Sequence, residues 1–252
     1  MEKQTKKKWY AFVPNLLTLA NLLCGTIAVY MAFNGEIALA VYLMFAGALF
    51  DFFDGFVARL LKVSGELGKQ LDSLADVITF GFLPGALAFM IQSKLIGFDA
   101  GENHHLKIAE YIYLLIPLLI PAFSALRLAK FNIDTRQSHS FIGLPTPANA
   151  LFFAALALII FDQKNTALSF LHHPLLIAII VVVFSLLLLA EIPLFSLKFT
   201  TFKGKENFIR YLFLAASLGL LLLFSIKGIG AIILLYLLLS IINNMTGKSV
   251  KS

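Results

Sequence analysis

Residues 37–61 read IALAVYLMFAGALFDFFDGFVARLL, an apolar run that is interrupted near its end by Asp51 and Asp54. At 1.5 Å per residue, a helix of this length crosses the roughly 30 Å hydrocarbon core of a bilayer. Charged side chains are costly at that depth, so aspartates inside such a run indicate a functional site. The stretch therefore predicts a membrane-spanning helix and a site within it.

The rest of the chain has the same character. Of its 252 residues, 60% are apolar and only 13% are charged, and the mean hydropathy is +0.89. A soluble domain carries roughly 25% charged residues, so this composition excludes a soluble globular protein and a disordered one. Only helices and closed barrels satisfy the backbone in lipid, and the alternating pattern of barrel strands is absent. We therefore expect an all-α, polytopic transmembrane helix bundle that forms one domain over residues 1–252.

Long apolar segments recur along the whole sequence. A window of about 19 residues predicts about eight spans, within a range of six to eight. The predicted spans are 12–33, 37–61, 70–92, 108–128, 141–161, 174–197, 208–226 and 228–244.

The basic residues are distributed unequally between the two sides of this bundle. Eight spans put sixteen of them on the side of the termini: Lys3, Lys6, Lys7, Lys8, Arg59, Lys62, Lys69, Arg127, Lys130, Arg136, Lys198, Lys203, Lys205, Arg210, Lys248 and Lys251. The other side holds four: Lys94, Lys107, Lys164 and Lys227. Because cytoplasmic loops are rich in Lys and Arg, both termini are expected in the cytoplasm, with the protein in the cell (inner) membrane. The net charge of +6 lies in short clusters rather than a continuous stripe, so we expect no nucleic acid as a partner.

Four aspartates form the main polar feature of the predicted spans. Asp51 and Asp54 lie late in the second span, and Asp72 and Asp76 lie early in the third. At 100° per residue, the second-span pair shares a stripe about 140° wide with three further residues, Gly55, Ala58 and Arg59. Gly68, Asp72 and Asp76 are four residues apart and form a second stripe. A short loop joins the two helices as an antiparallel pair, so the four carboxylates are expected to converge at the cytoplasmic end.

Carboxylates gathered in a low-dielectric setting repel one another unless they are protonated or neutralised by cations. Oxygen ligands alone suit Mg²⁺ or Mn²⁺, and two such ions could share the cluster. Neither His nor Cys accompanies the aspartates, which argues against zinc. A network of Asp–Arg pairs and a cation pathway are the alternatives at this point.

The spacing of these residues resembles a known family signature. Asp51-Phe-Phe-Asp54-Gly55-Phe-Val-Ala58-Arg59, followed by Gly68, Asp72 and Asp76, fits D-x₂-D-G-x₂-A-R-x₈-G-x₃-D-x₃-D. The chain is therefore similar to the CDP-alcohol phosphatidyltransferases, which are integral membrane enzymes of phospholipid synthesis. The resemblance implies that Asp51, Asp54 and Asp72 bind two divalent cations, with Asp76 as a ligand or general base. It also implies that Gly55, Ala58, Arg59 and Gly68 line the site for CDP-diacylglycerol.

Three further segments are similar to the phosphatidylserine synthase branch of that family. They are the stretch from Pro14 to Gly25, the stretch from Ser73 to Pro84, and the blocks Arg127-Leu-Ala-Lys130-Phe131-Asn132 and Phe141-Ile-Gly143-Leu-Pro145-Thr-Pro147-Ala148. In this branch arginine is common at the position of Lys130. The resemblance implies CDP-diacylglycerol and L-serine as substrates. Glycerol 3-phosphate or inositol phosphate as acceptor is the alternative within the family, and a cation transporter is the alternative outside it.

Several polar residues near the cluster have two interpretations each. Arg127, Lys130 and Arg136 are on the predicted cytoplasmic side, where they would bind the acceptor's carboxylate or anchor the loops. Asn15 and Asn21, in the first span, would bind the ribose or cytosine, or join helices by hydrogen bonds. Gly81 and Gly85 form a G-x-x-x-G spacing that suits a homodimer no better than a contact between helices of one chain.

Overall fold

The computed structural model describes residues 9–63, 65–98, 106–133, 143–162, 168–194 and 207–245. In these segments the chain forms helices joined by short connections. The elements are α1 (Val13–Phe33), α2 (Ile37–Leu61), α3 (Glu66–Asp76), α4 (Leu83–Ile96), α5 (Ile108–Leu115), α6 (Leu119–Ile133), α7 (Thr146–Phe161), α8 (Pro174–Leu189), α9 (Phe208–Phe224) and α10 (Ile229–Met245). Short 3-10 or π-helical pieces are η1 (Trp9–Phe12), η2 (Val77–Phe82), η3 (Ile116–Leu118), η5 (Ser169–His172) and η6 (Ser225–Gly228). The all-α expectation is confirmed.

Five helical runs in the described segments are long and apolar enough to cross a membrane. They are Val13–Phe33, Ile37–Leu61, Glu66–Ile96, Ile108–Ile133 and Phe208–Asn244. The helices Thr146–Phe161 and Pro174–Leu189 are apolar but shorter. The predicted spans 141–161 and 174–197 are thus longer than the helices found there. The expected total of eight spans remains a prediction.

Prolines explain why these two helices are short. Pro147 lies in the first turn of α7, a position that proline fits well. Pro145 is the extended N-cap of the helix, and a proline disfavours helix in the residue before it. Helix α8 ends at Leu189, and the next residue, Ala190, is already extended. Pro193 then follows within one turn, and helices commonly stop before a proline.

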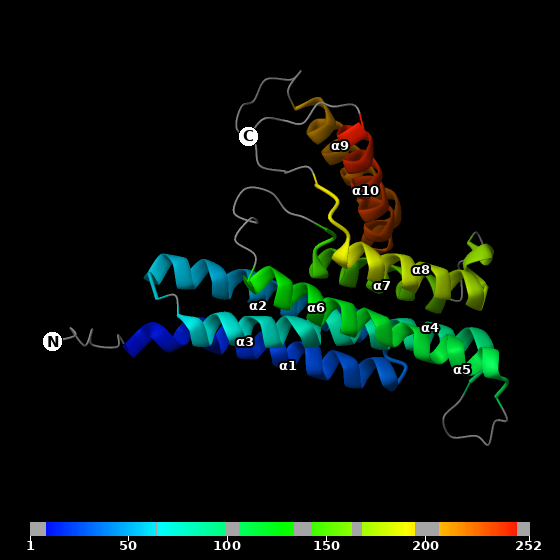
Figure 1. Cartoon of the computed structure of the whole chain (residues 1–252), viewed down its shortest axis with the longest axis horizontal. Helices are drawn as coiled ribbons and strands as arrows, with labels where there is room; N and C mark the ends of the chain where they lie inside the picture. Colours follow the sequence, from blue (N-terminus) through cyan, green and yellow to red (C-terminus); the bar gives the residue numbers. More distant parts are fainter. Residues whose placement is uncertain are drawn as a thin grey trace.

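Helices α1 to α8 lie side by side along the long axis of the molecule, whereas α9 and α10 leave this bundle at a steep angle (Figure 1). The apolar run 208–244 folds back on itself at Ser225, whose backbone has φ of 52° and ψ of −141°. The core fills the space between α1, α2, α4, α7, α8 and α10, with Met44, Leu87 and Phe153 fully buried.

The run from Glu66 to Ile96 passes through the middle of the bundle and changes its helical pitch on the way. The π-helical segment η2 begins directly after Asp76, and Pro84 follows in the first turn of α4. Proline cannot supply the hydrogen bond that an α-helix needs at that point, and single π turns are frequent at functional sites. The change from α-helix to π-helix thus occurs directly after Asp76, next to the predicted aspartate cluster.

The Gly81–Gly85 spacing is used inside the chain. A Cβ atom on Gly81 would lie 3.0 Å from Cβ of Ser124, and one on Gly85 would lie 2.8 Å from Cδ of Pro121. Both glycines thus allow α6 to approach the run 66–96 closely. The homodimer that this motif left open remains a prediction.

Candidate active site

Three of the four predicted aspartates meet where α2 faces α3. Asp51, Asp72 and Asp76 each offer a carboxylate oxygen, and the three oxygens lie within 4.8 Å of one another. All three side chains are partly buried. The four-residue spacing of Asp72 and Asp76 puts both on one face of α3. Helices α2 and α3 both pack against α1, which brings this face close to Asp51.

The donor set fits a hard divalent cation. Three carboxylates at this separation and depth repel one another strongly unless positive charge balances them. Among the described residues the group consists of carboxylate oxygen donors, without a His or Cys side chain, and such a set suits Mg²⁺ or Mn²⁺ better than zinc. Asp51, Asp72 and Asp76 are therefore the residues that would hold the ion.

Asp54 lies close by but has a different partner. Its side chain is 6% exposed, and its Oδ2 accepts a hydrogen bond of 2.6 Å from Oγ1 of Thr18 on α1. The group of three oxygens does not include Asp54. Its role as a fourth ligand remains a prediction, and Thr18 is a contact that the sequence analysis missed.

A cavity of about 260 Å³ opens beside the aspartates. Asp54 and Asp72 contribute to its wall, and so do five of the six residues predicted to bind the nucleotide lipid. Its full lining is Pro14, Asn15, Thr18, Asp54, Gly55, Ala58, Arg59, Val63, Gly65, Gly68, Lys69 and Asp72. The signature residues of α2 and α3 thus form one continuous wall next to the carboxylates.

The two signature glycines keep this cavity open. A Cβ on Gly68 would lie 3.2 Å from Oδ1 of Asn15, and one on Gly55 would lie 3.5 Å from Nη1 of Arg59. A side chain at Gly68 would therefore press on Asn15, and one at Gly55 would make an ordinary contact with the Arg59 guanidinium and fill space next to it. This supports the expectation that both positions admit a ligand.

Asn21 is the sixth of the predicted nucleotide-binding residues, and it lies elsewhere. It is fully buried on α1 and does not belong to the cavity lining. Its Nδ2 donates to Oδ1 of Asp76 at 3.4 Å. Its contact is therefore with the carboxylate cluster.

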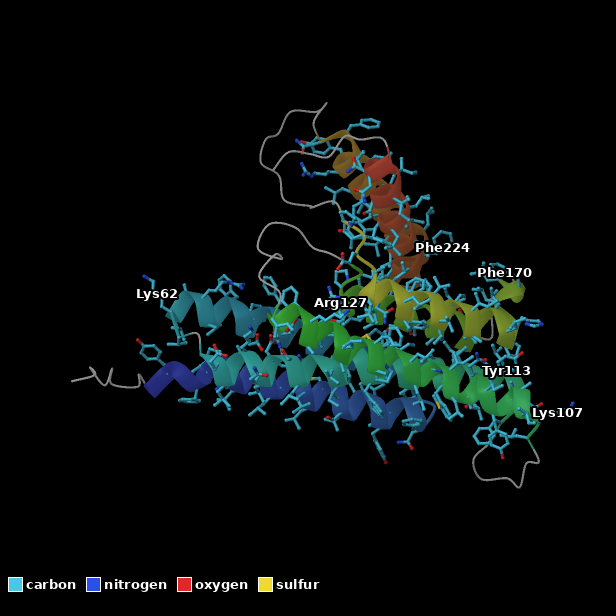
Figure 2. The ribbon with its side chains drawn as sticks, in the orientation of Figure 1. Lys62, Lys107, Tyr113, Arg127, Phe170 and Phe224 are labelled. Atoms are coloured by element: carbon cyan, nitrogen blue, oxygen red, sulfur yellow. The ribbon has the colours of Figure 1, made fainter. Side chains whose placement is uncertain are left out.

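The three predicted acceptor-binding residues have different surroundings. Arg127, on α6, is 9% exposed. Its Nε has no hydrogen-bond partner among the described residues. Lys130 is exposed, and Arg136 lies outside the described residues. Figure 2 shows Arg127 in the middle of the bundle, between Lys62 toward one end and Lys107 at the other.

A second polar contact that the sequence analysis missed joins α3 to α6. Lys69 lines the cavity, and its Nζ donates to the backbone oxygen of Asn132 at 2.9 Å. The Asn132 side chain in turn donates to Oγ of Ser73 at 2.7 Å. Asn132 ends the block 127–132 that the sequence analysis quoted, so its position was visible although its partners were not. These bonds place the helix with Arg127 beside the helix with Asp72 and Asp76.

Comparison with known proteins gives a consistent result. The model of the CDP-alcohol phosphatidyltransferase family matches residues 11–202. A CDP-diacylglycerol–serine O-phosphatidyltransferase of Bacillus subtilis is 34% identical over 168 residues, which cover 67% of this chain and 81% of that protein. One of Helicobacter pylori is 30% identical over 232 residues, 91% of this chain and 89% of the relative. An archaetidylserine synthase of Methanothermobacter thermautotrophicus is 34% identical over 166 residues, 64% of this chain and 65% of the relative.

Proposed function

This chain belongs to the CDP-alcohol phosphatidyltransferase family, and we propose that it transfers the phosphatidyl group of CDP-diacylglycerol to L-serine. The products would be phosphatidylserine and CMP. The observation that carries the proposal is the three-aspartate group beside a cavity lined by the family's signature residues. Serine as acceptor is supported by relatives from two bacteria and one archaeon whose names specify a serine product or substrate.

In the proposed reaction, the hydroxyl oxygen of serine attacks the β-phosphorus of CDP-diacylglycerol, and the bond from that phosphorus to the CMP oxygen breaks. Divalent cations, when bound, would neutralise the pyrophosphate and the developing charge on the entering and leaving oxygens. Asp51, Asp72 and Asp76 would hold them. A role for Asp54 as a further ligand is part of the proposal.

The chain's own residues would supply binding and proton transfer. Asp76 would accept the proton of the serine hydroxyl as general base. Asn15 and Arg59, with Gly55, Ala58 and Gly68 between them, line the cavity for the nucleotide. Arg127 is the proposed partner for the serine carboxylate, because it is a buried cation on α6 whose Nε has no hydrogen-bond partner among the described residues. Lys130 and Arg136 are the further residues proposed for that role.

The membrane arrangement forms a second part of the proposal. The apolar helices and the family show a multi-pass membrane protein. We propose eight spans, one domain over residues 1–252, and both termini and the active site facing the cytoplasm of the inner membrane. The excess of basic residues on the side of Lys69 supports this orientation. An impermeant thiol reagent should therefore label a cysteine placed at Lys94 in intact cells, and one placed at Lys69 only after lysis; the reverse pattern would contradict the orientation.

One assay of the purified protein tests the reaction. CMP release from CDP-diacylglycerol is measured with L-serine, glycerol 3-phosphate, inositol phosphate or no acceptor, each with Mg²⁺, with Mn²⁺ or with excess chelator. We expect release only with serine and a divalent cation, and formation of phosphatidylserine in equal amount. Release with another alcohol alone would overturn the serine assignment. Absence of release under every condition would favour the cation-transporter alternative.

A further inference from the structure

The buried side chain of Asn21, on α1, contacts the carboxylate cluster. The side chain has no exposed surface, and its Nδ2 donates to Oδ1 of Asp76 at 3.4 Å. An amide on one oxygen of a carboxylate fixes the orientation of the group, while the remaining lone pairs stay available to an ion. Hydrogen bonds of this kind behind a metal ligand tune its affinity for the metal.

Asn21 is itself held by the helical run that carries Asp76. Oγ1 of Thr79 donates to the backbone oxygen of Asn21 at 3.2 Å. Thr79 is fully buried and follows Asp76 by three residues, inside the π-helical segment η2. The run 66–96 therefore contacts Asn21 twice, through Asp76 at its side chain and through Thr79 at its backbone.

Two glycines make this contact sterically possible. A Cβ on Gly25 would lie 2.3 Å from Oγ1 of Thr79. A Cβ on Gly47 would lie 2.9 Å both from Oδ1 of Asn21 and from Cγ2 of Thr79. Real Cβ atoms do not approach other atoms this closely, so α1, α2 and η2 can meet around Asn21 only because both positions lack a side chain.

The same helix supports Asp54 in a comparable way. Thr18 precedes Asn21 by three residues and thus lies on the same face of α1. It donates to Asp54 of α2, as Asn21 donates to Asp76 of the third run. One face of α1 therefore contacts an aspartate from each of the two helices that carry the signature.

We propose that Asn21, held by Thr79 and accommodated by Gly25 and Gly47, is the positioning residue for Asp76. It fixes the carboxylate in the orientation in which Asp76 joins Asp51 and Asp72 around a divalent cation. This inference rests on the proposed function for its catalytic meaning, but its first consequence is metal affinity, which is measurable without substrate. Asn21 thereby acts on the reaction through Asp76 rather than by contact with the nucleotide.

The test compares two buried amides of one chain. Asn21→Leu keeps the approximate shape of the side chain and removes its donor. Gln92→Leu is the matched control, because Gln92 is also fully buried and donates to a backbone oxygen, that of Pro174, at 3.0 Å. It lies sixteen residues after Asp76 on the same run, about 24 Å along the helix. Binding of Mn²⁺ to each purified protein is measured by electron paramagnetic resonance, without substrate.

We expect Asn21→Leu to weaken Mn²⁺ binding about 10- to 100-fold, as is typical for loss of a hydrogen bond behind a metal ligand. Gln92→Leu should bind as the unmodified protein does. Equal Mn²⁺ affinity in Asn21→Leu and the unmodified protein, or an equal loss in Gln92→Leu, would overturn the inference. Lack of saturable Mn²⁺ binding by the unmodified protein would overturn it too.

A second pair of variants keeps the inference testable if Asn21→Leu does not fold. Thr79→Val removes the hydroxyl with little change of shape, and Thr79→Ser keeps it. We expect Thr79→Val to weaken Mn²⁺ binding about 2- to 10-fold, the usual effect of one hydrogen bond, and Thr79→Ser to restore it. Identical affinities in the two variants would contradict the role of Thr79. If Mn²⁺ binding responds as expected while serine-dependent CMP release is absent, the positioning role stands and the proposed reaction fails.

Discussion

The run Glu66–Ile96 and the run Phe208–Asn244 are both strongly apolar, yet they have opposite surroundings. Within their most hydropathic windows, 61% of the residues are buried in the first run and 17% in the second. The first lies between α1, α2, α6 and α7, and hydrogen bonds from Asn21 and Asn132 reach its polar residues. The second forms the α9–α10 hairpin beside the bundle (Figure 1), and large side chains such as Leu222 and Leu223 are 77% exposed.

This difference shows that hydropathy alone does not separate a helix that builds a site from one that faces lipid. In a bilayer an exposed leucine is already in an apolar solvent, so helices associate through close packing and polar contacts instead. The run 66–96 has both features: its glycines let neighbouring helices approach closely, and its aspartates make polar contacts with those helices. The α9–α10 hairpin is packed much less closely against the rest of the described chain. Substitutions should therefore have large effects in the first region and small effects in the second.

The largest effect is expected at the aspartates. Asp76→Asn should lower serine-dependent CMP release by about 10²- to 10⁴-fold, the usual cost of losing a general base. Asp51→Asn should lower both Mn²⁺ binding and affinity for CDP-diacylglycerol, because a metal ligand holds the donor's pyrophosphate while a base acts on the acceptor's proton.

Binding of Mn²⁺ and CDP-diacylglycerol to each purified aspartate variant, measured beside turnover, separates these roles. Because Asp76 is also a proposed ligand, Mn²⁺ binding should fall in both variants, and a loss of turnover in Asp76→Asn that exceeds its loss of binding identifies the base role. Near-normal turnover of Asp76→Asn would contradict both roles of that residue.

A pair of glycine substitutions gives the intermediate effect. Gly25→Ala puts a Cβ 2.3 Å from Oγ1 of Thr79 and 3.0 Å from its Cα, so backbone must move. We expect a loss of about 1–3 kcal/mol in the free energy of unfolding, which is typical of overpacking, and a parallel fall in activity.

The matched control for Gly25→Ala is Gly219→Ala in α9. No atom of the described residues lies within 4 Å of the new Cβ there, so stability should be unchanged or rise by up to about 1 kcal/mol, because alanine favours a helix. Thermal unfolding in detergent provides the comparison. A loss of stability in Gly219→Ala that is larger than the loss in Gly25→Ala would show that α9 is packed against a partner.

The smallest effect is expected on the exposed face of the hairpin. Leu222→Ala should change the free energy of unfolding by less than about 0.5 kcal/mol, since the side chain is 77% exposed. Leu87→Ala, in the fully buried core of α4, should cost about 2–5 kcal/mol. Chemical denaturation of both variants in the same detergent measures the difference. A cost at Leu222 that approaches the cost at Leu87 would contradict the lipid-facing assignment.

The sequence by itself determined the helical class, the family and the aspartate set. These features depend on local periodicity: an apolar run that is long enough for the bilayer, and a spacing of three or four residues that puts Asp72 and Asp76 on one face of their helix. The signature also indicated most of the cavity lining, because Gly55, Ala58 and Arg59 share the face of α2 that carries Asp54.

Only the tertiary structure decided which polar residues of the other helices contact these aspartates. Thr18 contacts Asp54 across 36 positions of the chain, Asn21 contacts Asp76 across 55, and Thr79 contacts Asn21 across 58. Such pairs depend on how closely α1, α2 and η2 approach and on their rotation about their own axes. Gly25 and Gly47 permit that approach because they have no side chain. Periodicity within one helix holds no information on the distance to another, so these partners emerge only when the helices are packed together.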